Sequence, residues 1–138
     1  MLNPVNDVLE AKLRDALPDA AFRPLTAAYL EEPRGRYAGQ DALLIAPATT
    51  QEVSVVIKAA YDAGVAVVPY GGGTGLVGGQ VAPDGPKPII LSLEQMTAIS
   101  EVFPTENVMI AEAGAILADI QAAAEKYDRL FALSLASE

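Results

Sequence analysis

The sequence contains neither cysteine nor histidine. Without cysteine the chain cannot form a disulfide or supply a thiolate nucleophile. Without histidine it can build neither a Ser-His-Asp triad nor a histidine-based zinc site. Any reaction that involves this domain must therefore take its chemistry from a cofactor or from residues outside the chain. We accordingly predict no catalytic residue and no metal ligand within it.

Basic residues are scarce as well, because 9 Lys and Arg stand against 18 Asp and Glu, for a net charge of -9. Proteins that bind nucleic acids neutralise phosphates with clustered basic side chains. The sequence therefore predicts no nucleic-acid partner. Hydrophobic residues make up 51% of the chain, which is typical of a folded domain rather than of a disordered tail.

The sequence shows no secretory signal and no transmembrane segment. Its opening, MLNPVNDVLEAKLRD, carries charges throughout and lacks the apolar core of a signal peptide. The uncharged window 63–83 is rich in glycine and contains Pro69 and Pro83, which disfavour a helix within lipid. We therefore predict a cytoplasmic protein.

Apolar periodicity and turn residues predict the order of the elements. The expected elements are a helix over 6–17, strands over 42–48, 65–70 and 88–93, a hairpin within 96–114 that turns near Asn107, and a helix over 115–127. In the first helix Val8, Leu9, Leu13 and Leu17 repeat at helical spacing as its apolar stripe. Residues 18–41 are expected to form a loop or short helix.

A further helix is predicted between the first two strands. The letters TTQE at 49–52 match a capping box, in which Thr49 accepts from the first turn and Glu52 reaches back. Gly64 fits the C-terminal cap, and the apolar stripe consists of Val53, Val56, Ile57 and Ala60. Strand, helix and strand within about thirty residues predict a parallel βαβ unit with a right-handed crossover.

The segment VVPYGGGTGLVGG follows this unit, and six of the 11 glycines fall within 71–79. A flexible linker would be rich in polar residues, whereas this segment lies between apolar strands. The pattern G-x-G-x-x-G at 73–78, with Glu94 near the offset of a ribose-binding acid, makes a Rossmann loop a rival interpretation. That loop must open a helix, and the nine residues QVAPDGPKP, which contain three prolines, are too short and too broken for a crossover helix. We therefore interpret the match, and with it the ribose-binding role of Glu94, as accidental. A Walker A loop is excluded because Gly79 and Gln80 replace its Lys-Ser/Thr pair.

A glycine loop that closes without a helix presents consecutive N–H groups as a concave anion site. Thr74 adds a hydroxyl group, and we expect Leu76 and Val77 to pin the loop to the core. The residues therefore predict a bound anion, most simply a diphosphate.

Tyr29, Tyr37 and Arg36 are interpreted as packing residues of a loop rather than ligand contacts. Glu31 and Glu32 are interpreted as part of a solvated surface.

The segment VVPYGGGTGLVGGQVAP also resembles the diphosphate loop of the FAD-linked oxidases, the vanillyl-alcohol oxidase superfamily with a PCMH-type FAD-binding domain. The resemblance extends over residues 42–138 and is to the branch of glycolate and D-lactate dehydrogenases. It implies an α+β fold: a small parallel βαβ subdomain followed by the start of an antiparallel α+β subdomain. The expected parts are an N-terminal helix and loop (1–41), the βαβ unit with its glycine loop (42–93), and a hairpin, helix and start of a second FAD segment (94–138).

The resemblance also implies the site and the activity. The FAD diphosphate would lie against Gly71, Gly72, Gly73, Thr74, Gly75, Gly78 and Gly79, and Ser134 would be a second FAD contact. Some relatives attach FAD through a histidine at the position of Thr74, so binding here is expected to be non-covalent. Many relatives carry arginine where this chain has Tyr70. The implied reaction is hydride transfer from a 2-hydroxy acid of the glycolate, D-lactate or D-2-hydroxyglutarate type to FAD, with electrons passed to a separate acceptor.

The substrate residues of such oxidases lie in a later domain. The chain is therefore expected to be the N-terminal part of a longer oxidase and to be inactive alone. Because it contains no catalytic group, a non-catalytic nucleotide- or anion-binding module is the alternative interpretation.

Overall fold

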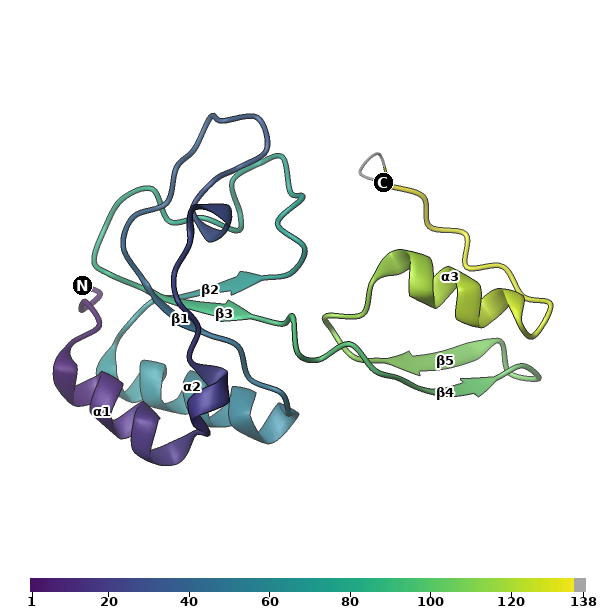
Figure 1. Cartoon of the computed structure of the whole chain (residues 1–138), viewed down its shortest axis with the longest axis horizontal. Helices are drawn as coiled ribbons and strands as arrows, with labels where there is room; N and C mark the ends of the chain where they lie inside the picture. Colours follow the sequence, from purple (N-terminus) through teal and green to yellow (C-terminus); the bar gives the residue numbers. More distant parts are fainter. Residues whose placement is uncertain (136–138) are drawn as a thin grey trace. The chain divides into compact units, whose positions relative to one another are not determined.

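The computed structural model describes residues 1–135. The chain forms two compact units, Met1–Gln95 and Met96–Glu138 (Figure 1). The first contains helices α1 (Asp7–Ala16) and α2 (Thr50–Ala63), the short 3₁₀ helices η1 (Asp19–Ala21) and η2 (Ala27–Tyr29), and strands β1 (Leu43–Ile45), β2 (Val67–Tyr70) and β3 (Ile89–Ser92). The second contains strands β4 (Ile99–Phe103) and β5 (Val108–Ala111) and helix α3 (Leu117–Glu125).

The sheet of the first unit is parallel, with the strand order β1-β3-β2. The predicted parallel strands are thus confirmed, but β1 and β2 do not pair with each other, because β3 lies between them. β3 is buried along its whole length, as expected for the central strand of a parallel sheet. At the end of the sheet Tyr70 of β2 lies opposite Ser92 of β3.

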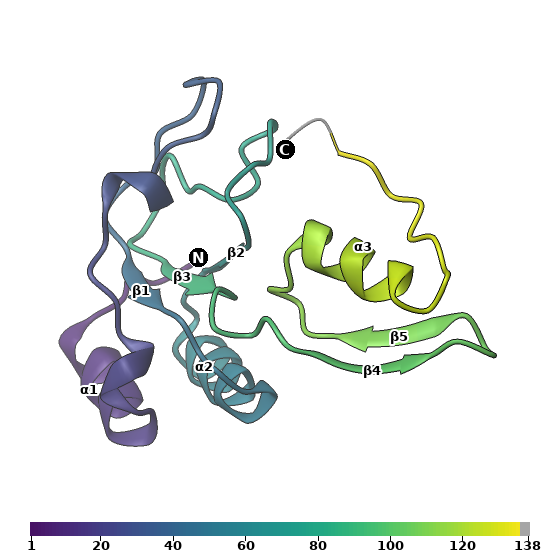
Figure 2. The same ribbon diagram turned by 45° about the vertical axis from the view of Figure 1, so that its right-hand side comes forward.

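Two apolar clusters cover the two faces of this sheet. On one face, Leu13 of α1 and Val56 of α2 pack with Ile45 and Ile89, and all four are fully buried. On the other face, the segment of residues 25–30 packs over Leu44 and Ile90. Burial of about four such side chains contributes several kcal/mol, at roughly 1.5–3 kcal/mol for each. Figures 1 and 2 show this layering, with α1 and α2 on one side of the sheet and residues 27–40 on the other.

The predicted helix signals form as expected. Asn6 caps α1 by accepting from the Leu9 N–H at 2.9 Å. In α2 the Thr49 hydroxyl accepts from the Glu52 N–H at 3.2 Å, and the Glu52 carboxylate accepts from the Ala48 N–H at 2.7 Å. Gly64 ends α2 in the left-handed conformation, with φ of 66°.

The predicted apolar stripes of the helices are wrong at two positions. Val8 is 78% exposed and Ile57 is 44% exposed, whereas Ala59 is buried. The strands of the sheet are only three or four residues long. Each helix therefore buries a narrow stripe on the sheet, and apolar residues at the margin of that stripe reach solvent.

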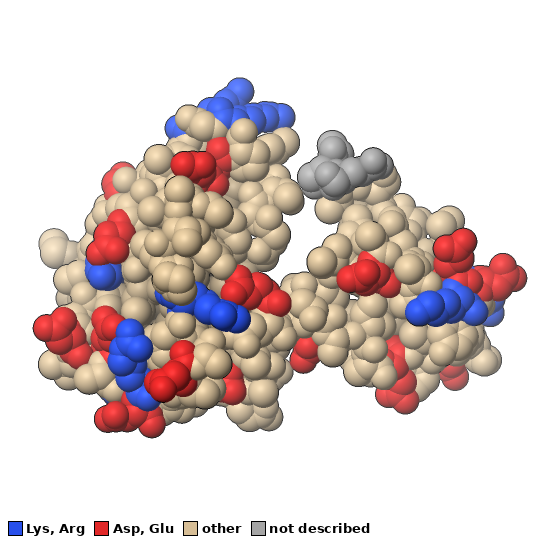
Figure 3. Space-filling view, in the orientation of Figure 1, with Lys and Arg blue, Asp and Glu red and all other residues tan. Residues whose placement is uncertain are grey.

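The second unit is an antiparallel hairpin with one helix, as predicted. β4 and β5 pair antiparallel, and Asn107 turns the chain with a left-handed φ of 55°. α3 packs against β4. The α+β fold class is thus confirmed. Within residues 1–135 no helix is long and apolar enough to cross a membrane. On the face shown in Figure 3, Lys and Arg atoms form small separate groups, one of them at the top of the first unit.

Candidate cofactor-binding site

The glycine loop, residues 71–79, begins where β2 ends. Because β1, β2 and β3 are parallel, their carboxyl ends lie at the same edge of the sheet. Open α/β sheets bind ligands beyond this edge. The described residues between β2 and β3 contain turns and bends but no helix, so the structure excludes the Rossmann interpretation as the sequence analysis did.

The glycines of this loop fall into two sets. In the middle of the loop a β-carbon would collide with the protein itself: at Gly73 with the Tyr70 hydroxyl, at Gly75 with Gln80 Oε1 at 2.8 Å, and at Gly78 with the Tyr37 ring at 2.8 Å. Gly73 and Gly78 also have left-handed φ angles of 70° and 75°, which other residues adopt at a cost. These three glycines are explained by the packing of the chain.

The glycines at the two ends of the loop have no such explanation. A β-carbon at Gly71 or Gly79 would meet nothing within 4 Å, and one at Gly72 would make only an ordinary contact at 3.9 Å with the Thr74 methyl group. None of the three has a left-handed φ. The chain's own packing and backbone therefore leave these positions free, as the approach of a bulky ligand to the main chain requires.

The main-chain N–H groups and carbonyls of the loop differ in whether the protein itself uses them. Among the hydrogen bonds of residues 1–135, none is donated by a main-chain N–H from Gly71 to Gly79. The carbonyls of Gly73 and Gly75 instead accept from Gln80 Nε2, at 3.3 and 2.7 Å. An anion requires free donors without facing acceptors, and the two peptide units whose carbonyls bind Gln80 supply this arrangement.

The apolar residues of the loop do not hold it to the core. Leu76 is 38% exposed and Val77 is 86% exposed, so the prediction that they pin the loop was wrong. Gln80 holds it instead, through its hydrogen bonds to the Gly73 and Gly75 carbonyls. The Tyr70 and Tyr37 side chains occupy the space beside Gly73 and Gly78 that a side chain there would need. Sequence reasoning missed Gln80, whose only signal was a polar residue between the glycines and a buried valine.

Tyr70 is fixed beneath the loop by the segment that precedes β1. Its hydroxyl donates to the Ala28 carbonyl at 2.9 Å, and its ring lies 4.9 Å from the Tyr29 ring, tilted by 53°. Burial, and secondarily the charge of Glu94, raise the pKa of Tyr70. Tyr29 packs against the cluster around Ile90, as predicted for a packing residue.

Tyr37 is carried by a short hairpin whose turn is built on Glu32. The Glu32 carboxylate accepts from the Arg34 and Arg36 N–H groups, each at 3.1 Å. Glu32 is only 2% exposed, so its predicted place on a solvated surface was wrong. Both N–H groups donate to the same oxygen, Oε2, whereas Oε1 is buried without a hydrogen-bond partner among the described residues. Figures 1 and 2 show this hairpin and the glycine loop on the same side of the sheet.

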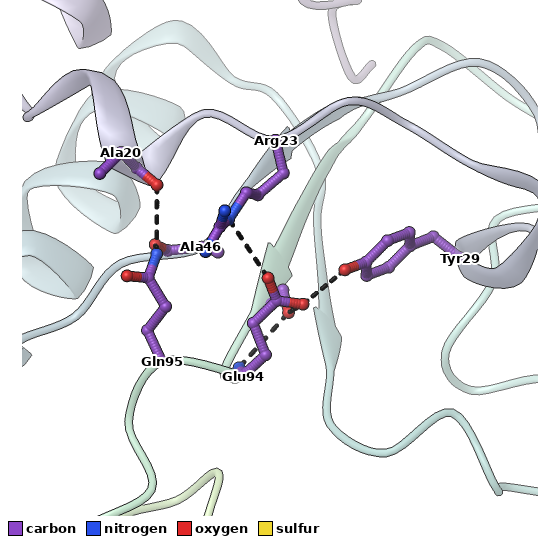
Figure 4. A network of polar contacts seen from close by, with 7 residues as sticks. Ala20, Arg23, Tyr29, Ala46, Glu94 and Gln95 are labelled. Carbon is purple, nitrogen blue, oxygen red and sulfur yellow. Dashed lines mark hydrogen bonds and ion pairs between the residues drawn. The ribbon is translucent and has the colours of Figure 1, made fainter.

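Glu94 lies at the end of β3 and joins the sheet to the N-terminal segment (Figure 4). Its carboxylate accepts hydrogen bonds from the Tyr29 and Ser92 hydroxyls and pairs with Arg23 at 3.4 Å. The hydrogen bond with Glu94, assisted by burial, raises the pKa of Tyr29 to about 12. Its neighbour Gln95 donates to the carbonyls of Ala20 and Ala46. Glu94 is therefore engaged within the protein, which agrees with the rejection of its ribose-binding role.

Two predicted cofactor residues lie on exposed segments. Thr74 is exposed within the loop, between glycines of the middle set. Ser134 belongs to the second unit, in an exposed irregular stretch after α3. The assignment of the seven loop residues and of Ser134 to FAD stays a prediction.

The second unit contains a cavity of about 430 Å³. It is lined mainly by apolar residues of the hairpin and of the segment after α3, such as Phe103, Met109 and Phe131. Its charged residue, Arg129, donates to the Pro104 carbonyl and to the Asn107 side chain. The cavity contains no residue of the glycine loop and no group that could perform chemistry.

Comparison with known proteins agrees with this geometry. The family described as FAD binding domain matches residues 42–138. A D-2-hydroxyglutarate–pyruvate transhydrogenase of Saccharomyces cerevisiae is 34% identical over 102 residues, which cover 74% of this chain and 20% of that protein. A D-lactate dehydrogenase of Archaeoglobus fulgidus is 34% identical over 114 residues, or 83% of this chain and 24% of that protein. The chain thus spans about a fifth to a quarter of the length of these relatives.

Solved structures show the same fold at low sequence identity. An alkyldihydroxyacetonephosphate synthase matches 91% of this chain and 28% of its own, with a TM-score of 0.74 and 16% identity. A berberine bridge enzyme variant matches 86% of this chain and 26% of its own, with a TM-score of 0.65 and 15% identity.

The chain belongs to the FAD-binding domain family, and FAD is its cofactor. The residues present fit that group. Free N–H donors, open space at Gly71, Gly72 and Gly79, and carbonyls turned to Gln80 together suit an anionic ligand that lies against the main chain.

Proposed function

We propose that this chain supplies the diphosphate-binding wall of a flavoprotein that oxidises a small 2-hydroxy acid. The proposal rests on Gly71 and Gly79 at the two ends of the loop, where a side chain would meet no other atom of the protein. The loop binds the diphosphate through N–H groups of residues 71–75 and 78–79, and Thr74 adds its hydroxyl. The similarity to a D-2-hydroxyglutarate–pyruvate transhydrogenase and a D-lactate dehydrogenase supports the substrate class.

The composition indicates which roles this chain has and which belong to the cofactor or to other residues. When bound, FAD would supply the redox chemistry, which is hydride acceptance from the hydroxy acid and transfer of electrons to a separate acceptor. The chain has no histidine or cysteine, so its own residues bind and orient the cofactor. We propose that groups outside these 138 residues bind the substrate and accept its proton. The cytoplasmic location stays a prediction.

We further propose that FAD is held without a covalent bond, because Thr74 cannot form the bond that a histidine at this position forms. Precipitation of the flavin-loaded protein with acid tests this directly. All yellow colour should appear in the supernatant. Flavin that stays with the washed pellet would contradict non-covalent binding.

Titration of the chain with FAD, ADP and riboflavin, followed by calorimetry and flavin fluorescence, tests the assignment of the loop. FAD and ADP share the diphosphate, so both should bind, and riboflavin should bind far more weakly. A chain that prefers ADP and gains nothing from the flavin would instead be a non-catalytic nucleotide-binding module. Equal binding of riboflavin and FAD would contradict a diphosphate site.

The substrate class is tested on the complete flavoprotein. D-lactate, D-2-hydroxyglutarate and glycolate are added without oxygen, and bleaching of the flavin absorbance is recorded. At least one of these acids should bleach the flavin. If the flavoprotein binds FAD but none of these acids reduces it, the cofactor site is supported and the proposed substrate class is contradicted.

A further inference from the structure

Gln80 follows the last glycine of the loop and is buried, with 8% of its surface exposed. Its side-chain amide donates to two carbonyls of the loop, to Gly75 O at 2.7 Å and to Gly73 O at 3.3 Å. A side-chain amide nitrogen carries two hydrogens, so both of its donors are committed to the loop.

These contacts fix the direction of two N–H groups. A peptide unit is planar, and in the trans form its carbonyl and N–H point in opposite directions. None of the peptide bonds in the described part of the chain, residues 1–135, is cis. The Gly73 carbonyl shares its peptide plane with the Thr74 N–H, and the Gly75 carbonyl shares its plane with the Leu76 N–H. Because both carbonyls point to the buried Gln80, both N–H groups point away from it.

The surroundings of these two N–H groups suit a ligand. Thr74 and Leu76 are both exposed, and neither N–H donates to another group within residues 1–135. Gly75 also lacks a side chain for this reason, because a β-carbon there would lie 2.8 Å from Gln80 Oε1 and displace the amide.

We propose that Gln80 is the positioning residue of the anion site. Its amide draws the Gly73 and Gly75 carbonyls inward and so directs the Thr74 and Leu76 N–H groups at the diphosphate. The inference rests on the proposed function, because it names how the same loop is oriented toward FAD. Without Gln80 the carbonyls are free to turn outward, where they repel phosphate oxygens.

The matched variants are Gln80→Met and Gln40→Met. Gln40 also donates its side-chain amide to a carbonyl, that of Gly85 at 2.8 Å, outside the loop. Both variants lose the same kind of hydrogen bond. Only Gln80→Met should weaken FAD binding, by about tenfold or more, since misdirected N–H groups lose charge-assisted hydrogen bonds. Riboflavin binding should respond equally little to both variants.

A measurement on the wild-type chain does not depend on how a variant folds. Addition of FAD or ADP should shift the ¹⁵N–¹H amide signals of Thr74 and Leu76, and Gln80→Glu, which lacks the donor, should lose these shifts. If wild type binds no FAD, the proposed function and this inference both fail. If wild type binds FAD but the two amides do not respond, or Gln80→Met binds as tightly as Gln40→Met, only the role of Gln80 is overturned.

Discussion

The ends and the middle of the glycine loop use the same residue for different physical reasons. In the middle, Gly73, Gly75 and Gly78 make room for side chains of the protein, as shown by the short distances to Tyr70, Gln80 and Tyr37. At the ends, Gly71 and Gly79 face open space. The glycines that the protein itself needs therefore carry little information about a ligand, whereas those it does not need are the evidence for one.

The largest effect is expected at Gly73. A side chain there must adopt a left-handed φ of 70° and displace the Tyr70 hydroxyl from the Ala28 carbonyl. Gly73→Val should lower the free energy of unfolding by about 2–3 kcal/mol and abolish FAD retention. Chemical denaturation and the visible spectrum measure the two effects. A variant that keeps both stability and flavin would contradict the contact with Tyr70.

Gly71→Val separates the two sets of glycines. The position has open space and no left-handed φ, so the thermal midpoint should change by less than about 2 °C, the equivalent of roughly half a kcal/mol. FAD binding should weaken by about tenfold or more, because the side chain occupies the approach to the main chain. Unchanged FAD affinity in this variant would contradict the claim that the cofactor approaches the main chain at Gly71.

Thr49→Ala is the control for stability alone. It removes the cap of α2, which should cost about 1 kcal/mol and lower the thermal midpoint by about 4 °C. FAD affinity should be unchanged, since α2 covers the opposite face of the sheet. If FAD affinity falls with stability here, the loss in Gly73→Val cannot be assigned to the loop.

The smallest effect is expected from Tyr29, which supports the Tyr70 ring. The hydrogen bond with Glu94 raises the pKa of Tyr29 from its ordinary value of 10.0 to about 12. Below pH 10 the stabilisation is fully present. As the pH rises from 10 toward 12 the unfolded chain loses this proton first, so the free energy of unfolding falls. Tyr29→Phe should show a shallower decline over this range, measured by denaturation at each pH. Equal slopes would contradict the raised pKa.

Much of the fold follows from local signals in the sequence. The Thr49–Glu52 capping box, Gly64 and Asn107 are each determined by nearby residues, and each acts in the structure as predicted. The exposed positions Val8 and Ile57 were wrong because periodicity shows which residues could be buried, not how wide a face the short strands offer.

The candidate site could be predicted only in outline. The glycine cluster was visible in the sequence, but its division into two sets depends on contacts with residues far along the chain, such as Tyr37 at Gly78. Local pattern cannot show such contacts. For the same reason Leu76 and Val77 were expected to be buried, although the loop leads them away from both apolar clusters.

A crystal structure of the protein with FAD tests the central claim most directly. The account predicts that phosphate oxygens lie within hydrogen-bond distance of N–H groups of residues 71–76 and 78–79, with the Gly73 and Gly75 carbonyls still bound to Gln80. A diphosphate bound elsewhere, with Gly71 and Gly79 still facing solvent, would contradict it.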